Sequence, residues 1–166
     1  MNIVLIGYRG TGKSTVGRQL AARLGRTLVS TDTEIVKRAQ RTIPEIVAQE
    51  GWEYFRDLES EICREISSRD QLVIDTGGGA ILRAQNVEAL KTNGTVFWLT
   101  ASVETIARRI GSGNQRPSLT GTKSFVDEIQ DVLRERTPKY QAAADHIIVT
   151  DGRSTNQLME IILGLV

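Results

Sequence analysis

Residues 7–14 read Gly7-Tyr8-Arg9-Gly10-Thr11-Gly12-Lys13-Ser14, which fits the phosphate-loop pattern G-x-x-x-x-G-K-[ST]. An apolar run at residues 2–6 predicts a buried strand before the loop, and helically spaced apolar residues predict a helix after it, through Leu24. In that arrangement, backbone N–H groups and the helix N-terminus together bind phosphate. A chance glycine turn is the alternative, and the glycines lack the G-x-G-x-x-G spacing of dinucleotide sites. The stretch therefore predicts nucleotide binding.

Two side chains of this loop have the chemistry to handle a triphosphate. Lys13 can reach the outer phosphates, and the Ser14 hydroxyl can ligate Mg²⁺. Glycines let the backbone approach phosphate oxygens without a Cβ in the way. We therefore expect ATP contacts from six residues of the loop and the helix start: Gly10, Thr11, Gly12, Lys13, Ser14 and Thr15.

The composition is that of one globular domain. The chain has 166 residues, of which 40% are hydrophobic and 25% are charged, and its net charge is +1. This balance does not indicate nucleic-acid or membrane binding, and no apolar run is long enough to span a membrane. Cys63 is the single cysteine, so no internal disulfide can form. We expect a single domain over residues 1–166, located in the cytoplasm, and a monomer because nothing demands a partner chain.

Short apolar runs separated by helical patterns predict the fold class. The runs are residues 3–6, 27–30, 72–75, 95–99 and 147–150. Such strands alternating with helices indicate an α/β fold in which a parallel sheet has helices on both faces. Because ligands of these sheets bind beyond the carboxyl ends of the strands, the residues after each strand are candidates for a site.

Acidic residues and glycines follow two of the predicted strands. Asp32 comes shortly after the second strand, and Asp75 ends the third. An Asp at the end of an apolar strand resembles the second motif of nucleotide sites, which engages Mg²⁺. Three glycines follow at residues 77–79. A ligand close to the backbone would explain the triplet, and a tight left-handed turn is the alternative.

Residues 53–69 predict a long helix with one apolar stripe, made of Phe55, Leu58, Ile62 and Ile66. Cys63 lies on the flank of the stripe, which favours core packing over catalysis for this thiol. Glu59 lies within the stripe, three residues after Arg56, so it could hold Arg56 in place. A surface ion pair that contributes little is the alternative, and the spacing does not decide between them.

The stretch at residues 111–121 is polar and rich in glycine, and it predicts a mobile loop. Arg116 is its one cation. Long loops in compact domains are often lids, and otherwise exposed connections. His146 has no second histidine and no evident cysteine partner, so we assign it no metal role.

Taken together, these motifs resemble the shikimate kinase family over essentially the whole chain. The matching elements are the phosphate loop through Thr15, Thr31-Asp32, Phe55-Arg56-Asp57, the glycine triplet, Arg116-Pro117 followed by Ser118-Leu119, and Arg136-x-Pro138-x-Tyr140. The resemblance implies a P-loop fold of the nucleoside-monophosphate-kinase type, with a five-stranded parallel sheet and a lid at about residues 111–123. It also implies Mg²⁺-dependent transfer of the ATP γ-phosphate to the 3-hydroxyl of shikimate, a step of aromatic amino acid biosynthesis.

The resemblance also implies the roles of individual residues. Shikimate binding falls on Asp32, Arg56, Gly78, Gly79 and Arg136, with a substrate region at about residues 31–60. Catalysis falls on Lys13, Asp32 and Arg116, and further ATP contacts fall on Arg116 and Arg153. The chemistry fits, because guanidinium groups bind a planar carboxylate through paired N–H bonds better than lysine does.

The chain departs from the family pattern at two places. The family usually has Asp-x-Asp after the second strand, whereas this chain has Ser30 at the first of those positions. Asp75 stands where the family more often has a small residue. We hypothesise that Asp75, together with Ser14, forms the Mg²⁺ site in place of the missing carboxylate. This requires the second and third strands to be adjacent in the sheet. The second departure is Trp52, which we expect to cover the core and to which we assign no function.

Two other functions stay open at this point. One is a kinase of another polar acceptor such as gluconate, against which Phe-Arg-Asp and Arg-x-Pro-x-Tyr argue. The other is a non-catalytic nucleotide-binding homologue, supported by Ser30 and opposed by the retention of Lys13, Asp32, Arg116 and Arg136. A GTPase switch lacks an N-K-x-D guanine motif in this sequence.

Overall fold

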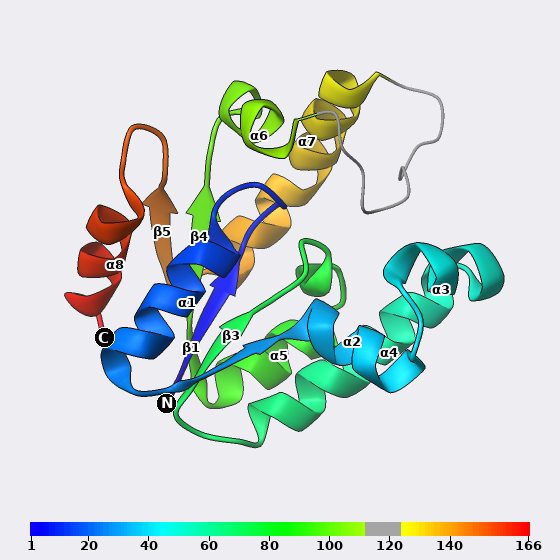
Figure 1. Cartoon of the computed structure of the whole chain (residues 1–166), viewed down its shortest axis with the longest axis horizontal. Helices are drawn as coiled ribbons and strands as arrows, with labels where there is room; N and C mark the ends of the chain where they lie inside the picture. Colours follow the sequence, from blue (N-terminus) through cyan, green and yellow to red (C-terminus); the bar gives the residue numbers. More distant parts are fainter. Residues whose placement is uncertain (112–123) are drawn as a thin grey trace.

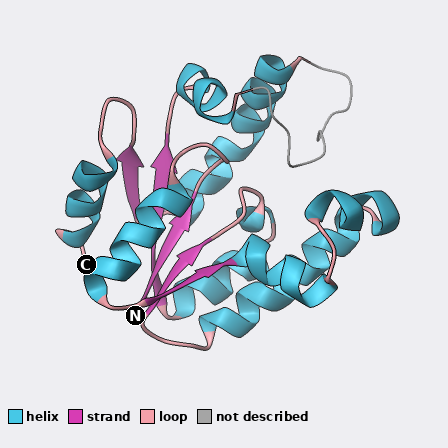
Figure 2. Ribbon diagram, viewed as in Figure 1, coloured by secondary structure: helices cyan, strands magenta, loops and turns pink. Residues whose placement is uncertain are grey.

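The centre of the molecule is a parallel sheet. The structure is a computed structural model that describes residues 1–111 and 124–166, and within these ranges it has five strands in the order β2-β3-β1-β4-β5 (Figure 1, Figure 2). The strands are β1 (Asn2–Ile6), β2 (Thr27–Ser30), β3 (Leu72–Asp75), β4 (Gly94–Thr100) and β5 (His146–Val149). All neighbouring pairs are parallel. The predicted α/β fold with a five-stranded parallel sheet is confirmed.

Helices connect the strands and cover both faces of the sheet (Figure 1). They are α1 (Lys13–Leu24), α2 (Thr31–Ala39), α3 (Ile43–Glu50), α4 (Trp52–Ser67), the short 3-10 helix η1 (Ala80–Leu82), α5 (Ala84–Thr92), α6 (Val103–Ile110), α7 (Phe125–Ala143) and α8 (Thr155–Leu163). Several of these helices begin after a residue whose side chain caps the first turn. Thr42, Ser102 and Ser124 each accept a hydrogen bond from a backbone N–H of the first turn, which satisfies an otherwise unpaired donor.

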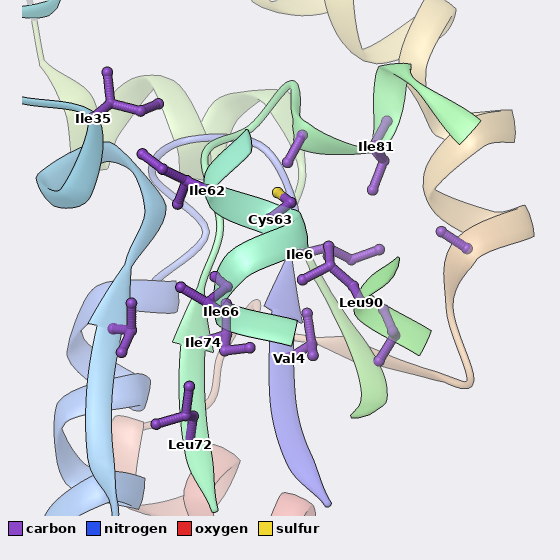
Figure 3. Packing of buried hydrophobic residues seen from close by; sticks show 14 of the residues in the cluster. Val4, Ile6, Ile35, Ile62, Cys63, Ile66, Leu72, Ile74, Ile81 and Leu90 are labelled. Carbon is purple, nitrogen blue, oxygen red and sulfur yellow. The ribbon is translucent and has the colours of Figure 1, made fainter. Parts of the chain in front are cut away.

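Two hydrophobic clusters lie on opposite faces of the sheet, and the central strand β1 contributes to both. Ile3 and Leu5 pack with side chains of α1 and α8. Val4 and Ile6 point the other way and pack with side chains of α4 and α5 (Figure 3). Successive side chains of a strand alternate between faces, so a strand buried on both sides must be apolar throughout. This explains the continuous apolar run before the phosphate loop.

Helix α4 carries the predicted apolar stripe into the larger cluster. Phe55, Ile62 and Ile66 are buried, and Leu58 is half-buried. Cys63 is also fully buried beside them, as Figure 3 shows, which confirms its assignment to the core. The helix begins one residue earlier and ends two residues earlier than predicted, within the usual uncertainty of helix ends.

We expect the Cys63 thiol to be unreactive in the folded protein. Burial, followed by the nearby charge of Glu59, raises its pKa from 9.0 to about 12, and the thiolate is the nucleophile. Ellman's reagent at about pH 8 should therefore label no thiol in the native state and one after denaturation. Because the thiol pKa is higher in the folded protein than in the unfolded chain, the protonated thiol favours the folded state. This contribution to the free energy of unfolding is present below about pH 9 and is lost as the pH rises toward 12. The melting temperature should therefore fall between these pH values. Rapid labelling of the native protein would contradict the burial of this thiol.

Candidate active site

A cavity of about 610 Å³ lies at the carboxyl ends of the central strands. Its walls come from the phosphate loop, the ends of β2 and β3, α6, and the start of α8. The lining residues include Arg9 to Val16, Ser30, Asp32, Asp75 to Gly78, Arg109, Arg153, Thr155 and Leu158. The six predicted ATP-contact residues of the phosphate loop and helix start are therefore brought together with Asp32, Asp75 and Arg153.

The phosphate loop has the backbone conformation that its glycines allow. Gly10 and Gly12 have φ of +82° and +97°, in the left-handed region that favours glycine. Gly12 caps the N-terminus of α1, so the helix points its first N–H groups at the cavity. The buried Lys13 Nζ donates to the carbonyl oxygens of Gly7 and Tyr8 at 2.8 and 3.0 Å. The ammonium group thus lies directly over the loop, where a phosphate would be bound.

Ser14 and Asp75 meet at the rim of the loop. The Ser14 hydroxyl donates to Asp75 Oδ2 at 2.6 Å. Asp75 ends β3, and its Cα partner in the ladder with β2 is Ser30, so the predicted adjacency of these two positions is confirmed. Burial raises the pKa of the Asp75 carboxyl above its ordinary value, and the charge of Lys13 and the Ser14 hydrogen bond oppose that rise. The arrangement keeps a largely buried carboxylate beside the phosphate loop.

Charged side chains crowd around the glycine triplet at residues 77–79. A methyl group on Gly77 would lie 2.7 Å from Asp32 Oδ1 and 3.1 Å from Glu59 Oε2, so any larger residue would displace these carboxylates. None of the three glycines has a positive φ, so the alternative of a left-handed turn is wrong. Glycine is needed at positions 77 and 79 because side chains approach the backbone closely there.

Two arginines from different helices reach the same triplet. A methyl group on Gly79 would lie 2.5 Å from Arg56 Cζ, and one on Gly78 would lie 3.5 Å from Arg136 Nη1. Arg136 is buried in α7, and the helix continues through Pro138 beyond it. The sequence-predicted substrate residues are thus brought together by α2, α4 and α7 at the end of β3.

Arg56 is held from several sides. Its Nη1 donates to Glu59 Oε1 at 2.8 Å, and the exposed side-chain fractions are 12% for Arg56 and 0% for Glu59. The alternative of a weak surface ion pair is therefore wrong. The guanidinium carbon also lies 5.5 Å from the ring centre of Trp52 and 5.1 Å from that of Phe55. Trp52 packs against the core, as expected, and in addition borders Arg56, which its sequence position did not reveal.

Tyr140 connects α7 to the triplet. Its hydroxyl donates to the carbonyl oxygen of Gly78, and its ring stacks on Trp98 of β4. Burial raises the pKa of this hydroxyl to about 12, so it stays a proton donor. Because Tyr140 lies one helical turn after Arg136, both project from the same side of α7 toward the triplet. The spacing of Arg136-x-Pro138-x-Tyr140 therefore has a geometric reason.

The cavity contains one further basic residue that was not predicted from the sequence. Arg109, at the end of α6, lines the cavity together with Arg153 and donates to Gly10 O at 3.3 Å and Thr150 Oγ1 at 3.1 Å. Its helix follows β4, whose carboxyl end lies at the cavity, and that placement is the signal that could have identified it. Asp151 holds the other end of α6 by accepting hydrogen bonds from Ser102 and Thr105, and the bond from Thr105 is the main reason that its pKa is lowered.

Arg116 and the lid predicted at about residues 111–123, apart from its first residue, lie outside the described part of the chain. Within residues 1–111 and 124–166, no three His, Cys, Asp or Glu side chains form a metal-binding group of their own. No helix of the described ranges has the length and apolar character needed to cross a bilayer.

Comparisons with known proteins agree with this geometry. The model of the shikimate kinase family matches residues 9–166. A shikimate kinase from Nitratidesulfovibrio vulgaris is 46% identical over 152 residues, covering 90% of this chain and 86% of that protein. A shikimate kinase from Syntrophus aciditrophicus is 44% identical and covers 98% of this chain and 89% of its own.

The fold comparison leads to the same family. The solved structure of a shikimate kinase from Acinetobacter baumannii in complex with shikimate matches with a TM-score of 0.94 and 40% identity, over 99% of this chain and 91% of that one. Sequence motifs, the family model and the fold agree over nearly the whole length. The chain therefore belongs to the shikimate kinase family.

Proposed function

We propose that this protein transfers the γ-phosphoryl group of ATP to the 3-hydroxyl of shikimate, forming shikimate 3-phosphate for aromatic amino acid biosynthesis. The observation that carries the proposal is the position of Asp32, Arg56 and Arg136 around one glycine triplet, of which Gly77 and Gly78 line the same cavity as Lys13.

Arg56 and Arg136 bind the carboxylate of shikimate in this proposal. Two guanidinium groups can each donate paired N–H bonds to a planar carboxylate, and such charge-assisted bonds are strong and directional. Glu59 and the ring of Trp52 hold Arg56 in place before the substrate arrives, so little side-chain entropy is lost on binding. Gly78 and Gly79 border the acceptor in this proposal, and Gly79 leaves room for Arg56 because it has no side chain.

Asp32 positions the attacking hydroxyl. Its carboxylate accepts a hydrogen bond from the 3-hydroxyl and takes the proton as the oxygen–phosphorus bond forms and the bond from ADP to the γ-phosphorus breaks. Lys13 stabilises the charge on the transferring group. Arg116 adds positive charge from the lid region at about residues 111–123, as the family resemblance implies. Catalysis by this arrangement is mainly positioning and electrostatic stabilisation.

The donor set beside the phosphate loop fits Mg²⁺. This ion prefers oxygen ligands and usually combines one or two protein groups with phosphates and water. Ser14 Oγ and the Asp75 carboxylate are oxygen donors in contact with each other next to Lys13. When bound with ATP, Mg²⁺ would neutralise charge on the phosphates. Arg153 and Arg109, which line the same cavity, would border the nucleoside of ATP.

The remaining assignments complete the proposal. We infer one domain over residues 1–166, with substrate contacts from about residues 31–60 and a lid at about residues 111–123. The +1 net charge and the absence of a spanning helix within the described ranges are compatible with a cytoplasmic enzyme. We infer a monomer that acts on two small molecules, ATP and shikimate, and that does not bind nucleic acid.

An ADP-release assay tests the proposed acceptor. With ATP and Mg²⁺ present, we expect shikimate to stimulate ADP formation and gluconate to leave it at the background rate, because only shikimate offers a ring carboxylate to the two arginines. Product analysis by phosphorus NMR should show one new phosphomonoester. Stimulation by gluconate alone would support the other kinase function, and stimulation by neither compound would support a non-catalytic homologue.

A further inference from the structure

We propose that the Asp75 carboxylate interacts with the magnesium ion bound to the nucleotide. We also propose that a carboxylate at position 30, on the neighbouring strand, can replace it. The inference rests on the proposed function, because it assumes that ATP and Mg²⁺ occupy the cavity. It places the metal-associated carboxylate at the end of β3, whereas Ser30 caps helix α2.

The two carboxylates of the cavity have different neighbours. Among the described lining residues, Asp32 and Asp75 are the carboxylates. Asp32 lies against Gly77, near the arginines proposed to bind the acceptor. Asp75 lies against Ser14, the hydroxyl that follows the phosphate-binding lysine. These neighbours therefore assign Asp32 to the acceptor and Asp75 to the phosphates.

The hydrogen bond between Ser14 and Asp75 has a direction that suits a cation site. Ser14 Oγ donates its proton to Asp75 Oδ2 at 2.6 Å. The lone pairs of the hydroxyl are then left to face the cavity, where an oxygen donor can ligate a hard cation. Asp75 therefore contributes in two ways, because it orients Ser14 and places a negative charge beside the ion. P-loop enzymes commonly hold Mg²⁺ with such a pair.

Ser30 lies beside Asp75 without contributing a charge. The two residues are Cα partners in the β2–β3 ladder, and neighbouring strands are about 4.8 Å apart. Both residues line the cavity. The Ser30 hydroxyl accepts from the Thr33 backbone N–H at 3.3 Å and so caps α2. Since Asp and Asn cap helices as well as Ser does, position 30 can receive a carboxylate without losing its structural task.

Calorimetric titration with ADP tests this assignment without relying on turnover. In the wild-type protein, ADP should bind more tightly with Mg²⁺ than with EDTA. Asp75→Asn keeps the shape of the side chain and should remove about 10- to 100-fold of the Mg²⁺-dependent gain. In EDTA the variant should bind ADP at least as tightly as the wild type, because a negative charge near the phosphates is gone.

Two double variants supply the matched control. Adding Ser30→Asp to Asp75→Asn should restore most of the Mg²⁺ dependence, and adding Ser30→Asn should restore none, although both retain a capping side chain. An unchanged Mg²⁺ effect in Asp75→Asn, or equal rescue by Asp and Asn at position 30, would overturn the assignment while leaving the nucleotide site intact. Failure of the wild type to bind ADP in either condition would overturn the proposed function as well. Thermal melting of each variant verifies that it is folded.

Discussion

Asp32→Asn is expected to lower kcat for shikimate phosphorylation by about 10²- to 10⁴-fold, the usual contribution of a positioned general base. The amide keeps the size of the side chain but accepts a proton poorly. Asp32 lies against Gly77, whereas Asp75 is the carboxylate that accepts a hydrogen bond from Ser14 of the phosphate loop. Affinity for ADP, measured by calorimetry, should therefore stay within about twofold of the wild type.

Glu34→Gln provides the control for that result. Glu34 lies on the same helix α2, loses the same charge on substitution, and pairs with Lys37 at 3.6 Å rather than facing the glycine triplet. Its kcat should remain close to that of the wild type, because a partly exposed pair of this kind contributes little. If Asp32→Asn retained a kcat within about threefold of the wild type, Asp32 would not be the base.

Gly79→Ala is expected to raise the KM for shikimate by about 10- to 100-fold, the loss of a single charge-assisted hydrogen bond of about 1.5–3 kcal/mol. The added methyl group would lie 2.5 Å from Arg56 Cζ, so the guanidinium group must move away from the triplet. Arg56 would then leave its bond to Glu59 and its place at the proposed carboxylate site. Steady-state kinetics with varied shikimate at saturating ATP give the KM, and the KM for ATP should change little.

A double-variant cycle distinguishes this effect from general damage. In an Arg56→Ala background, Gly79→Ala should add little further loss, because the group that the methyl displaces is already absent. Gly164→Ala is a matched control, since a methyl group there meets its nearest atom at 3.5 Å, an ordinary contact distance. Additive losses in the double variant would mean that Gly79 acts on shikimate binding by a route that does not involve Arg56.

Much of the fold followed from patterns within short stretches of the sequence. The phosphate loop and the five strands lie where the sequence predicts them, because each depends on residues only a few positions apart. The candidate site was less predictable. Arg109 was missed because its contact with Gly10 joins residues 99 positions apart. The spacing of Arg56 and Glu59 did not predict whether the pair is exposed, because that depends on how α4 packs against the sheet.

The sequence by itself determined the class of fold, the phosphate-binding element and the residue types of the site, because backbone propensities and side-chain periodicity act locally. Only the tertiary structure decided that Asp75 lies beside Ser30 and accepts a hydrogen bond from the Ser14 hydroxyl. Likewise, it decided that Arg56 and Arg136 approach the same glycines from α4 and α7. The physical reason is that strand order and helix packing depend on contacts between distant segments, which no local pattern encodes.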